Sequence, residues 1–162
     1  MPELSQVYLY YPLDKVFITQ PFGGNEAHYK RYGLKGHQGV DWRVRFSDSP
    51  LGRRYVSAMA DGVVEVVRWD VKGYGVHVRI RHADGALSIY GHLTKPYVSK
   101  GDLIKAQQII GLSGNTGDST GAHLHAEYRP AGWEKNTKNG YAGAIDMMPL
   151  FVNTLPKQFF KK

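Results

Sequence analysis

Short apolar runs separated by turn residues fill the middle of the chain. Residues 53–60 (RRYVSAMA) and 63–69 (VVEVVRW) flank the dipeptide Asp61-Gly62, and Asp-Gly between two such runs is a strong signal for a β-hairpin. Residues 74–83 (YGVHVRIRHA) alternate apolar and polar side chains, which is the pattern of a half-buried strand. The pattern therefore predicts short antiparallel strands that follow one another closely.

The same pattern continues along this region, and nothing in it has helical periodicity over a useful length. After a second Asp-Gly turn at 84–85, further strands are expected at residues 86–93, 107–114 and 122–129. We therefore expect an all-β fold, with an antiparallel β-sheet or sandwich core of short strands and long loops that form a groove.

Length and composition suit one domain with one core. The 162 residues are 42% hydrophobic, and no linker, internal repeat or low-complexity tract divides them. Outside the strand region we expect a turn near Pro12, a loop at 133–140, and a short helix or turn at 146–151. The prediction is a single domain over residues 1–162, with an extended N-terminal arm (1–18), a core (19–129) and a C-terminal extension (130–162).

Composition and charge narrow the possible partners. The chain has no cysteine, so disulfide frameworks and thiolate metal sites are excluded, and any metal must be held by nitrogen and oxygen ligands. A net charge of +7 favours polyanions, but no basic run with interleaved aromatic residues indicates nucleic-acid binding. The first residues do not resemble a signal peptide, and no apolar stretch approaches the roughly 20 residues of a membrane span. We expect a monomer made without membrane insertion, which needs separate release or delivery to work outside a cell.

Two short motifs suggest a metal site. His123 and His125 lie two apart on a predicted strand, so their imidazoles should share a face about 7 Å apart and could approach one ion. His37 precedes Asp41 by four residues, about 13 Å on a straight strand, but the two glycines of GHQGVD allow a bend. Imidazole and carboxylate are ordinary zinc ligands, although each motif alone also suits a solvated loop.

The other histidines carry weaker signals. His92, at the end of a predicted strand, would more often be structural, His77 is expected on the surface, and His82 is expected to support the turn at 84–85. Taken together, a His-Asp pair, a distant histidine and a His-x-His pair on a β scaffold outline metal-assisted hydrolysis. Three ligands would leave a fourth zinc position for water.

The order of these motifs resembles that of the lysostaphin and LytM type of zinc endopeptidase, from about Thr19 to Arg129. The residues that carry the resemblance are GHQGVD, YGHL and GNTGDSTGAHLH. The resemblance implies an antiparallel β core and hydrolysis of peptide bonds in the stem or cross-link of peptidoglycan. It implies that one zinc ion binds His37, Asp41 and His125, and that His92 and His123 are catalytic. Spacing alone leaves open which histidine of the pair binds the metal.

Some positions depart from the family's usual pattern. Ala122 stands where proline is common, Ala126 stands where an aromatic residue is common, and residues 43–54 form a somewhat long segment. These departures leave all the ligands in place but leave the wall type and the specificity open. The family also places a tyrosine near the metal in many members, and Tyr29 and Tyr32 are the candidates here.

The chain resembles a bacteriophage endolysin or a virion-associated lysin, because neither an export signal nor a wall-binding module is recognisable. The main alternative is a non-catalytic relative that binds the cell wall or activates an amidase. A carrier domain of the biotinyl or lipoyl kind, suggested by residues 100–111, lacks the required lysine at a hairpin tip. A further alternative, a nucleic-acid-binding protein, rests on the charge alone and does not explain the histidine pattern.

Overall fold

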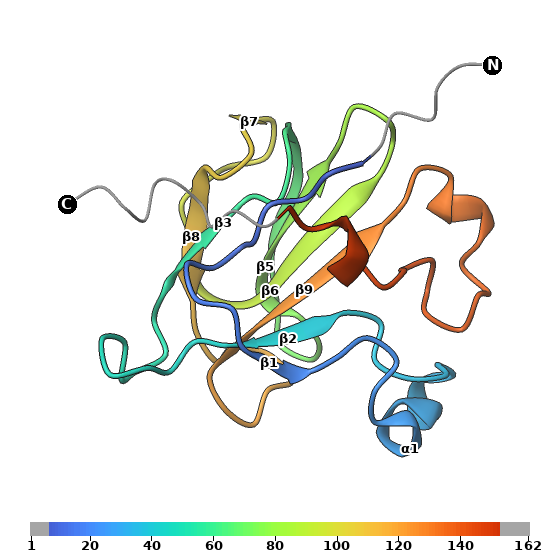
Figure 1. Cartoon of the computed structure of the whole chain (residues 1–162), viewed down its shortest axis with the longest axis horizontal. Coiled ribbons are helices and arrows are strands. Elements are labelled where there is room, and N and C mark those ends of the chain that lie inside the picture. The colour runs from blue at the N-terminus through green and yellow to red at the C-terminus, as the bar shows by residue number, and fades with distance from the viewer. Residues whose placement is uncertain (1–6, 153–162) are drawn as a thin grey trace.

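The computed structural model describes residues 7–152, which form an antiparallel β-sheet with a few short helices (Figure 1). The strands are β1 (Ile18–Gln20), β2 (Val40–Arg43), β3 (Tyr55–Ser57), β4 (Gly62–Asp70), β5 (Gly75–Arg81), β6 (Leu87–Pro96), β7 (Leu103–Ile104), β8 (Ile109–Ser113) and β9 (His123–Arg129). The helices are α1 (Glu26–Tyr29) and three 3₁₀ segments, η1 (Lys30–Tyr32), η2 (Trp133–Lys135) and η3 (Met148–Leu150).

The nine-stranded sheet has the order β1-β2-β9-β6-β5-β4-β7, and β8 pairs with both β3 and β6 beside this path. All of the strand pairs are antiparallel, so the predicted all-β fold class is confirmed. The strands predicted from the apolar pattern correspond to β3, β4, β5, β6, β8 and β9. Strands β1, β2 and β7 were not predicted, because they have 3, 4 and 2 residues and lie outside the longer apolar runs that marked the other strands.

The helices are also short, and this explains which of them the sequence predicted. Helix α1 has 4 residues and no buried side chain, so no apolar stripe marked it in the sequence. The loop predicted at 133–140 begins with η2, and the short helix or turn predicted at 146–151 is η3. Within the described residues, no helix is long and apolar enough to cross a membrane.

Strand β9 separates the hydrophobic core from the opposite face of the sheet. Leu124, Ala126 and Tyr128 belong to the core cluster. Because side chains alternate along a strand, the residues between them point to the other face. These residues are His123, His125, Glu127 and Arg129. The strand thus carries a row of polar side chains on a face that other segments partly cover.

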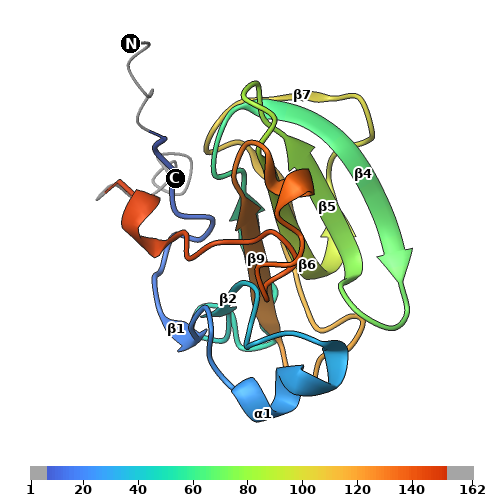
Figure 2. The same cartoon turned by 90° about the vertical axis from the view of Figure 1, so that its right-hand side faces the viewer.

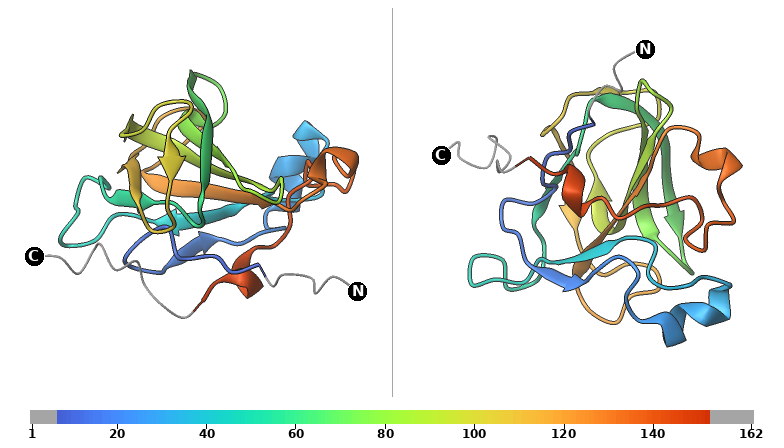
Figure 3. Two further views of the ribbon diagram at one scale, coloured as in Figure 1. Left: turned by 90° about the horizontal axis from the view of Figure 1, so that it is seen from above. Right: turned by 45° about the vertical axis from the view of Figure 1, so that its right-hand side comes forward.

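The N-terminal arm packs beside the C-terminal end of the described chain (Figure 3). The Leu9 N–H donates to the Leu150 carbonyl at 2.8 Å, and the Val152 N–H donates to the Leu9 carbonyl at 2.9 Å. Leu9 and Leu13 are fully buried. From residue 7 onward the arm is therefore held against the C-terminal extension, and residues 1–6 and 153–162 lie outside the described part.

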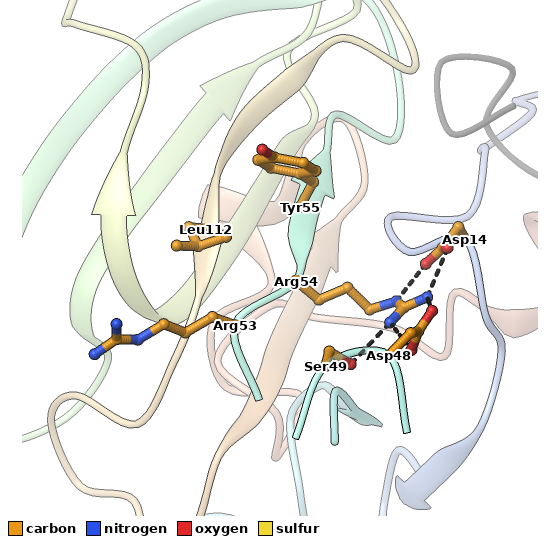
Figure 4. Close-up of a pocket in the computed structure, with 7 residues that line it drawn as sticks. All are labelled: Asp14, Asp48, Ser49, Arg53, Arg54, Tyr55 and Leu112. Carbon is orange, nitrogen blue, oxygen red and sulfur yellow. Dashed lines mark hydrogen bonds and ion pairs between the residues drawn. The ribbon is translucent and has the colours of Figure 1, made fainter. Parts of the chain in front are cut away.

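Arg54 ties the arm to the loop before β3 (Figure 4). Its guanidinium pairs with Asp14 of the arm and with Asp48, whose Oδ1 lies 2.9 Å from Nη1. It also donates to Ser49 Oγ at 2.8 Å. Arg53 points away from this cluster in Figure 4. Because the buried Arg54 charge has a carboxylate on each side, it joins two segments without an unpaired cation.

Three segments gather at one end of the sheet (Figure 2): the α1–η1 segment, the β4–β5 turn and the loop at 114–122. Gly117 has a φ of 78°, and a Cβ at this position would collide with the backbone of Gly75. Only glycine satisfies both the left-handed conformation and this close approach. The glycine-rich loop is therefore a tight connection that rests against the β4–β5 turn and leads into β9.

Candidate metal centre and active site

Strands β2 and β9 pair so that Asp41 lies directly opposite His125. Cross-strand partners share a face, so the carboxylate and the imidazole meet. His37 precedes β2 in a bend that returns its ring to the same point. Gly39 has no positive φ; it is needed because a Cβ would lie 2.7 Å from Cε1 of His125. The predicted bend is present, but close packing explains this glycine better than backbone freedom does.

Three potential ligand atoms converge at this point. His37 Nε2 lies 3.0 Å from His125 Nδ1 and 3.3 Å from Asp41 Oδ1, and His125 Nδ1 lies 2.9 Å from Asp41 Oδ1. A tetrahedral zinc ion with bonds of about 2.0–2.1 Å would separate its ligand atoms by about 3.3 Å. The donor set therefore fits a zinc ion with little adjustment, and these residues could hold a metal ion.

The second ring nitrogen of each candidate ligand histidine is directed at an acceptor of the protein. His37 Nδ1 lies 3.3 Å from the Pro21 carbonyl oxygen, and His125 Nε2 lies 3.0 Å from Glu127 Oε1. With a metal ion in place of the protons toward Asp41, His37 Nε2 and His125 Nδ1 would face it with lone pairs while these outer nitrogens keep their protons. Hydrogen bonding thus holds both rings in the orientation that a metal site requires.

His92 and His123 stand beside this cluster, with ring centroids 4.6 Å apart. His92 Nδ1 lies 2.7 Å from the Thr116 carbonyl oxygen and His123 Nδ1 lies 2.8 Å from the Gly121 carbonyl oxygen. Each ring can thus donate a hydrogen bond from Nδ1 to a backbone carbonyl, which leaves Nε2 as the nitrogen that can act on another group. His123 Nε2 lies 3.6 Å from Asp41 Oδ2, so the rings border the candidate metal position. The structure brings all five predicted site residues together.

Burial and charge set the protonation of these groups. Burial would raise the pKa of Asp41, but hydrogen bonds from His125 and His37 outweigh it and hold that pKa well below its usual range. Burial would lower the pKa of His125, but hydrogen bonds to Asp41 and Glu127 raise it to about 9. Burial, followed by the nearby His125 and His123, lowers the pKa of His92 to about 4. His92 is therefore a neutral imidazole at neutral pH.

Glu127 supports the cluster and was not predicted from the sequence. It is fully buried and accepts hydrogen bonds from the Tyr74 hydroxyl at 2.5 Å and from Arg129 Nη2 at 3.1 Å, in addition to the contact with His125. Its position two residues after His125 on a strand was the available signal, because that spacing places both on one face.

The two candidate tyrosines occupy different places. The Tyr29 ring packs against His37 with centroids 5.2 Å apart, and its hydroxyl accepts a hydrogen bond from Gln20 Nε2 at 3.0 Å. The Tyr32 hydroxyl donates to Asp118 Oδ2 at 3.1 Å. Tyr32 therefore connects η1 to the loop at 114–122, whereas Tyr29 lies directly against a candidate ligand.

His77 is not a surface residue, so that prediction is wrong. It is only 1% exposed, because Tyr74 from the β4–β5 turn packs near it with ring centroids 5.3 Å apart. Alternation along a strand cannot show that a turn folds back over the polar side. The backbone of His82 closes its turn by accepting the Gly85 N–H at 3.0 Å, whereas its side chain bonds Asp61 and Ser88 instead of the turn.

An antiparallel sheet that gathers a His-Asp-His cluster and two further imidazoles defines a candidate metallohydrolase site. The family model for peptidase family M23 matches residues 35–137, a stretch that contains all five of these residues. The chain belongs to peptidase family M23, and the resemblance found in its motifs is confirmed.

The curated relatives are longer proteins. The chain is 38% identical over 126 residues to an uncharacterized metalloprotease of Haemophilus influenzae, covering 77% of this chain and 25% of that protein. It is 33% identical over 135 residues to the peptidoglycan DD-endopeptidase ShyC of Vibrio cholerae, covering 83% of this chain and 30% of that protein. The chain thus spans about a quarter to a third of these relatives.

Solved structures of similar proteins agree with the assignment to this family. Lysostaphin from Staphylococcus simulans matches with a TM-score of 0.65 and 28% identity, covering 84% of this chain and 49% of that chain. The catalytic domain of the prophage-encoded M23 protein EnpA from Enterococcus faecalis, crystallised as a point mutant, matches with a TM-score of 0.63 and 27% identity. That match covers 85% of this chain and 94% of the EnpA chain.

Proposed function

We propose that this chain is a zinc-dependent endopeptidase that hydrolyses peptide bonds in the stem or cross-link of bacterial peptidoglycan. The observation that carries the proposal is the convergence of His37 Nε2, Asp41 Oδ1 and His125 Nδ1 within hydrogen-bond distance of one another. Relatives named as peptidoglycan DD-endopeptidases support the substrate class.

In the proposed mechanism, His37, Asp41 and His125 would hold the zinc ion. Zinc, when bound, supplies a Lewis acid that polarises the scissile carbonyl and makes water more acidic. His92 and His123 act beside it through their free Nε2 atoms. One accepts the proton of the attacking water, and the other stabilises the oxygen of the tetrahedral intermediate or protonates the leaving amine. The hydrogen bonds from Nδ1 to Thr116 and Gly121 orient both rings for this work.

The test is hydrolysis of two purified walls, one with direct cross-links and one with glycine bridges. Each is incubated with the protein as prepared, after chelation, and after zinc is added back. We expect clearing of the directly cross-linked wall, lost with the chelator and restored by zinc. Clearing that ignores the chelator, or zinc binding with cleavage of neither wall, would overturn the proposal; the second result would favour a wall-binding or amidase-activating role.

The delivery route is part of the proposal. The match over 94% of the EnpA catalytic domain, which is prophage-encoded, supports a phage lysin, and we propose that it acts as a monomer. Producing the chain inside bacteria, with and without a membrane-permeabilising protein, tests this route. We expect lysis only when the membrane is permeable, and lysis without permeabilisation would contradict it.

A further inference from the structure

Arg79 lies on the same face of the sheet as the candidate metal centre. Across three adjacent strands, Arg79 of β5 is opposite Ile89 of β6, and Ile89 is opposite Glu127 of β9. Direct cross-strand partners point to the same side, and strands lie about 4.8 Å apart, so Arg79 and Glu127 are about 10 Å apart at the backbone. Glu127 is two residues from His125, which places Arg79 two strands away from the candidate metal centre on the same face.

Tyr74 fills the space between the arginine and the metal ligand. Its ring lies 5.7 Å from the His125 ring, and its hydroxyl donates to Glu127 Oε1 at 2.5 Å. The Arg79 guanidinium carbon lies 5.5 Å from the centre of the same ring. A single side chain therefore separates the Arg79 charge from His125.

Arg81 and Arg129 have carboxylate partners, whereas Arg79 has none within residues 7–152. Arg81 pairs with Glu65 and with Glu134, each at 3.0 Å, and Arg129 pairs with Glu127 at 3.1 Å. No ion pair joins Arg79 to a described acidic residue, and its buried Nε has no hydrogen-bond partner there. Arg68 of β4, opposite His77 on the same face, also has no ion pair in the described chain but is solvent-exposed, whereas Arg79 is partly buried.

Several other unsatisfied polar atoms lie on the same face, around Tyr74 and Arg129, whereas Trp42 belongs to the core on the other side. Within the described chain, buried side-chain atoms without a hydrogen-bond partner are Gln38 Oε1, Trp42 Nε1, His77 Nε2, Arg79 Nε, Arg129 Nε and Trp133 Nε1. Arg129 reaches Tyr74 and lies over the Trp133 ring, 4.9 Å from its centre. Buried polar groups are normally paired, so unpaired N–H donors on two arginines and a tryptophan favour an anionic ligand.

We propose that Arg79 binds a free carboxylate of the peptide substrate and thereby selects acidic stem peptides over their amidated forms. This inference rests on the proposed peptidase function. An extended peptide advances about 3.3 Å per residue, so a carboxylate two to four residues from the hydrolysed bond would reach Arg79 when that bond lies at the metal centre. An arginine provides charge and paired N–H donors, which a carboxamide would use far less well.

The experiment compares two synthetic cross-linked peptides that differ only in one free or amidated carboxylate. Wild type should cleave the free acid about 10- to 100-fold more efficiently, the range expected for a charged hydrogen bond. Arg79→Gln should remove this preference, mainly by raising KM for the free acid, and Arg79→Lys should keep part of it. Lys100→Gln is the matched control, because it removes the same charge from an exposed turn that bonds the first residues of β4. It should behave as wild type.

A binding measurement separates this inference from the proposed function. His123→Ala and His123→Ala/Arg79→Gln are titrated with the same two peptides, and melting temperatures show that both variants fold. If His123→Ala binds the free acid more tightly than the amide and His123→Ala/Arg79→Gln does not, the carboxylate-binding role of Arg79 is supported even when no peptide is cleaved. Equal binding of both peptides by the first variant, or a loss in the second that is the same for both peptides, would overturn the role of Arg79.

Discussion

At the scale of single residues, each imidazole of the site directs one ring nitrogen at an acceptor of the protein. His37, His92 and His123 each direct Nδ1 at a backbone carbonyl, and His125 directs Nε2 at Glu127. Each ring therefore has one nitrogen oriented by the protein, and the proposed mechanism uses the other for the metal or the substrate. The sequence predicted these four residues but not the acceptors, because Pro21, Thr116 and Gly121 contribute backbone atoms that no side-chain pattern reveals.

The two kinds of histidine should respond differently to substitution. His123→Ala and His92→Ala should each reduce kcat by about 10²- to 10⁴-fold, the usual contribution of general acid–base catalysis, while zinc stays bound. Asp41→Ala should lose zinc together with activity, because it removes a charged ligand. Metal analysis and single-turnover rates check both, with exposed His28→Ala as the control. Zinc retained by Asp41→Ala, or full activity in both histidine variants, would contradict the assignments.

Glu127 should tune the metal affinity through His125. Glu127→Gln removes the carboxylate that orients this ring, and losses of about 10- to 100-fold in zinc affinity are typical for such partners. Competition with a chromophoric chelator measures the affinity directly. Glu134→Gln, which alters an exposed partner of Arg81, provides the matched control and should bind zinc as wild type does. Equal affinities in the two variants would show that Glu127 serves the fold alone.

At the scale of elements, the pattern of side chains predicted the long strands well and the site's surroundings poorly. β9 was predicted with the correct face for His123 and His125, because a period of two is unambiguous over 7 residues. The α1–η1 segment and β2 were missed because they are too short to show a periodic pattern. His77 was misplaced because Tyr74 covers it from a turn, which the pattern of its own strand cannot show.

Gly117 should matter more than Gly121, although both lie in the same loop. Gly117→Ala forces a side chain into a left-handed position that abuts Gly75, which should lower the free energy of unfolding by about 1–2 kcal/mol and displace the loop. Gly121→Ala meets no atom within 4 Å and should be nearly neutral. Denaturant midpoints compare the two variants, and an equal effect would refute this account of the loop.

At the scale of the whole molecule, buried ionisable groups connect stability to solution conditions. Burial lowers the pKa of His82, whose Nδ1 lies 2.6 Å from the Asp61 carbonyl oxygen and whose Nε2 lies 2.9 Å from Ser88 Oγ. The unfolded chain takes up a proton near its usual pKa of about 6.5, which the folded chain resists. Neutral His82 therefore contributes fully to the free energy of unfolding above about pH 6.5. This contribution is lost as the pH falls from there through the lower pKa of His82 in the folded chain.

His82→Gln should weaken this dependence because glutamine does not titrate. Between about pH 7.5 and pH 5 the unfolding midpoint of the variant should fall less steeply than that of wild type. His28→Gln, at an exposed position, should keep the wild-type slope. Thermal unfolding across this range measures both, and parallel curves for wild type and His82→Gln would exclude a role for this residue.

The bridge between the arm and the last described residues also has a mechanical meaning. Leu9 and Phe151 pair in parallel, so the chain leaves the bridge in opposite directions at its two ends. Tension applied to those ends would load the two hydrogen bonds of Leu9 in shear, together, instead of opening them one by one like a zipper. Because the bridge bears this force, tension on the two ends would not load β2 and β9. The candidate metal ligands on these strands would stay in place until the two hydrogen bonds of Leu9 broke.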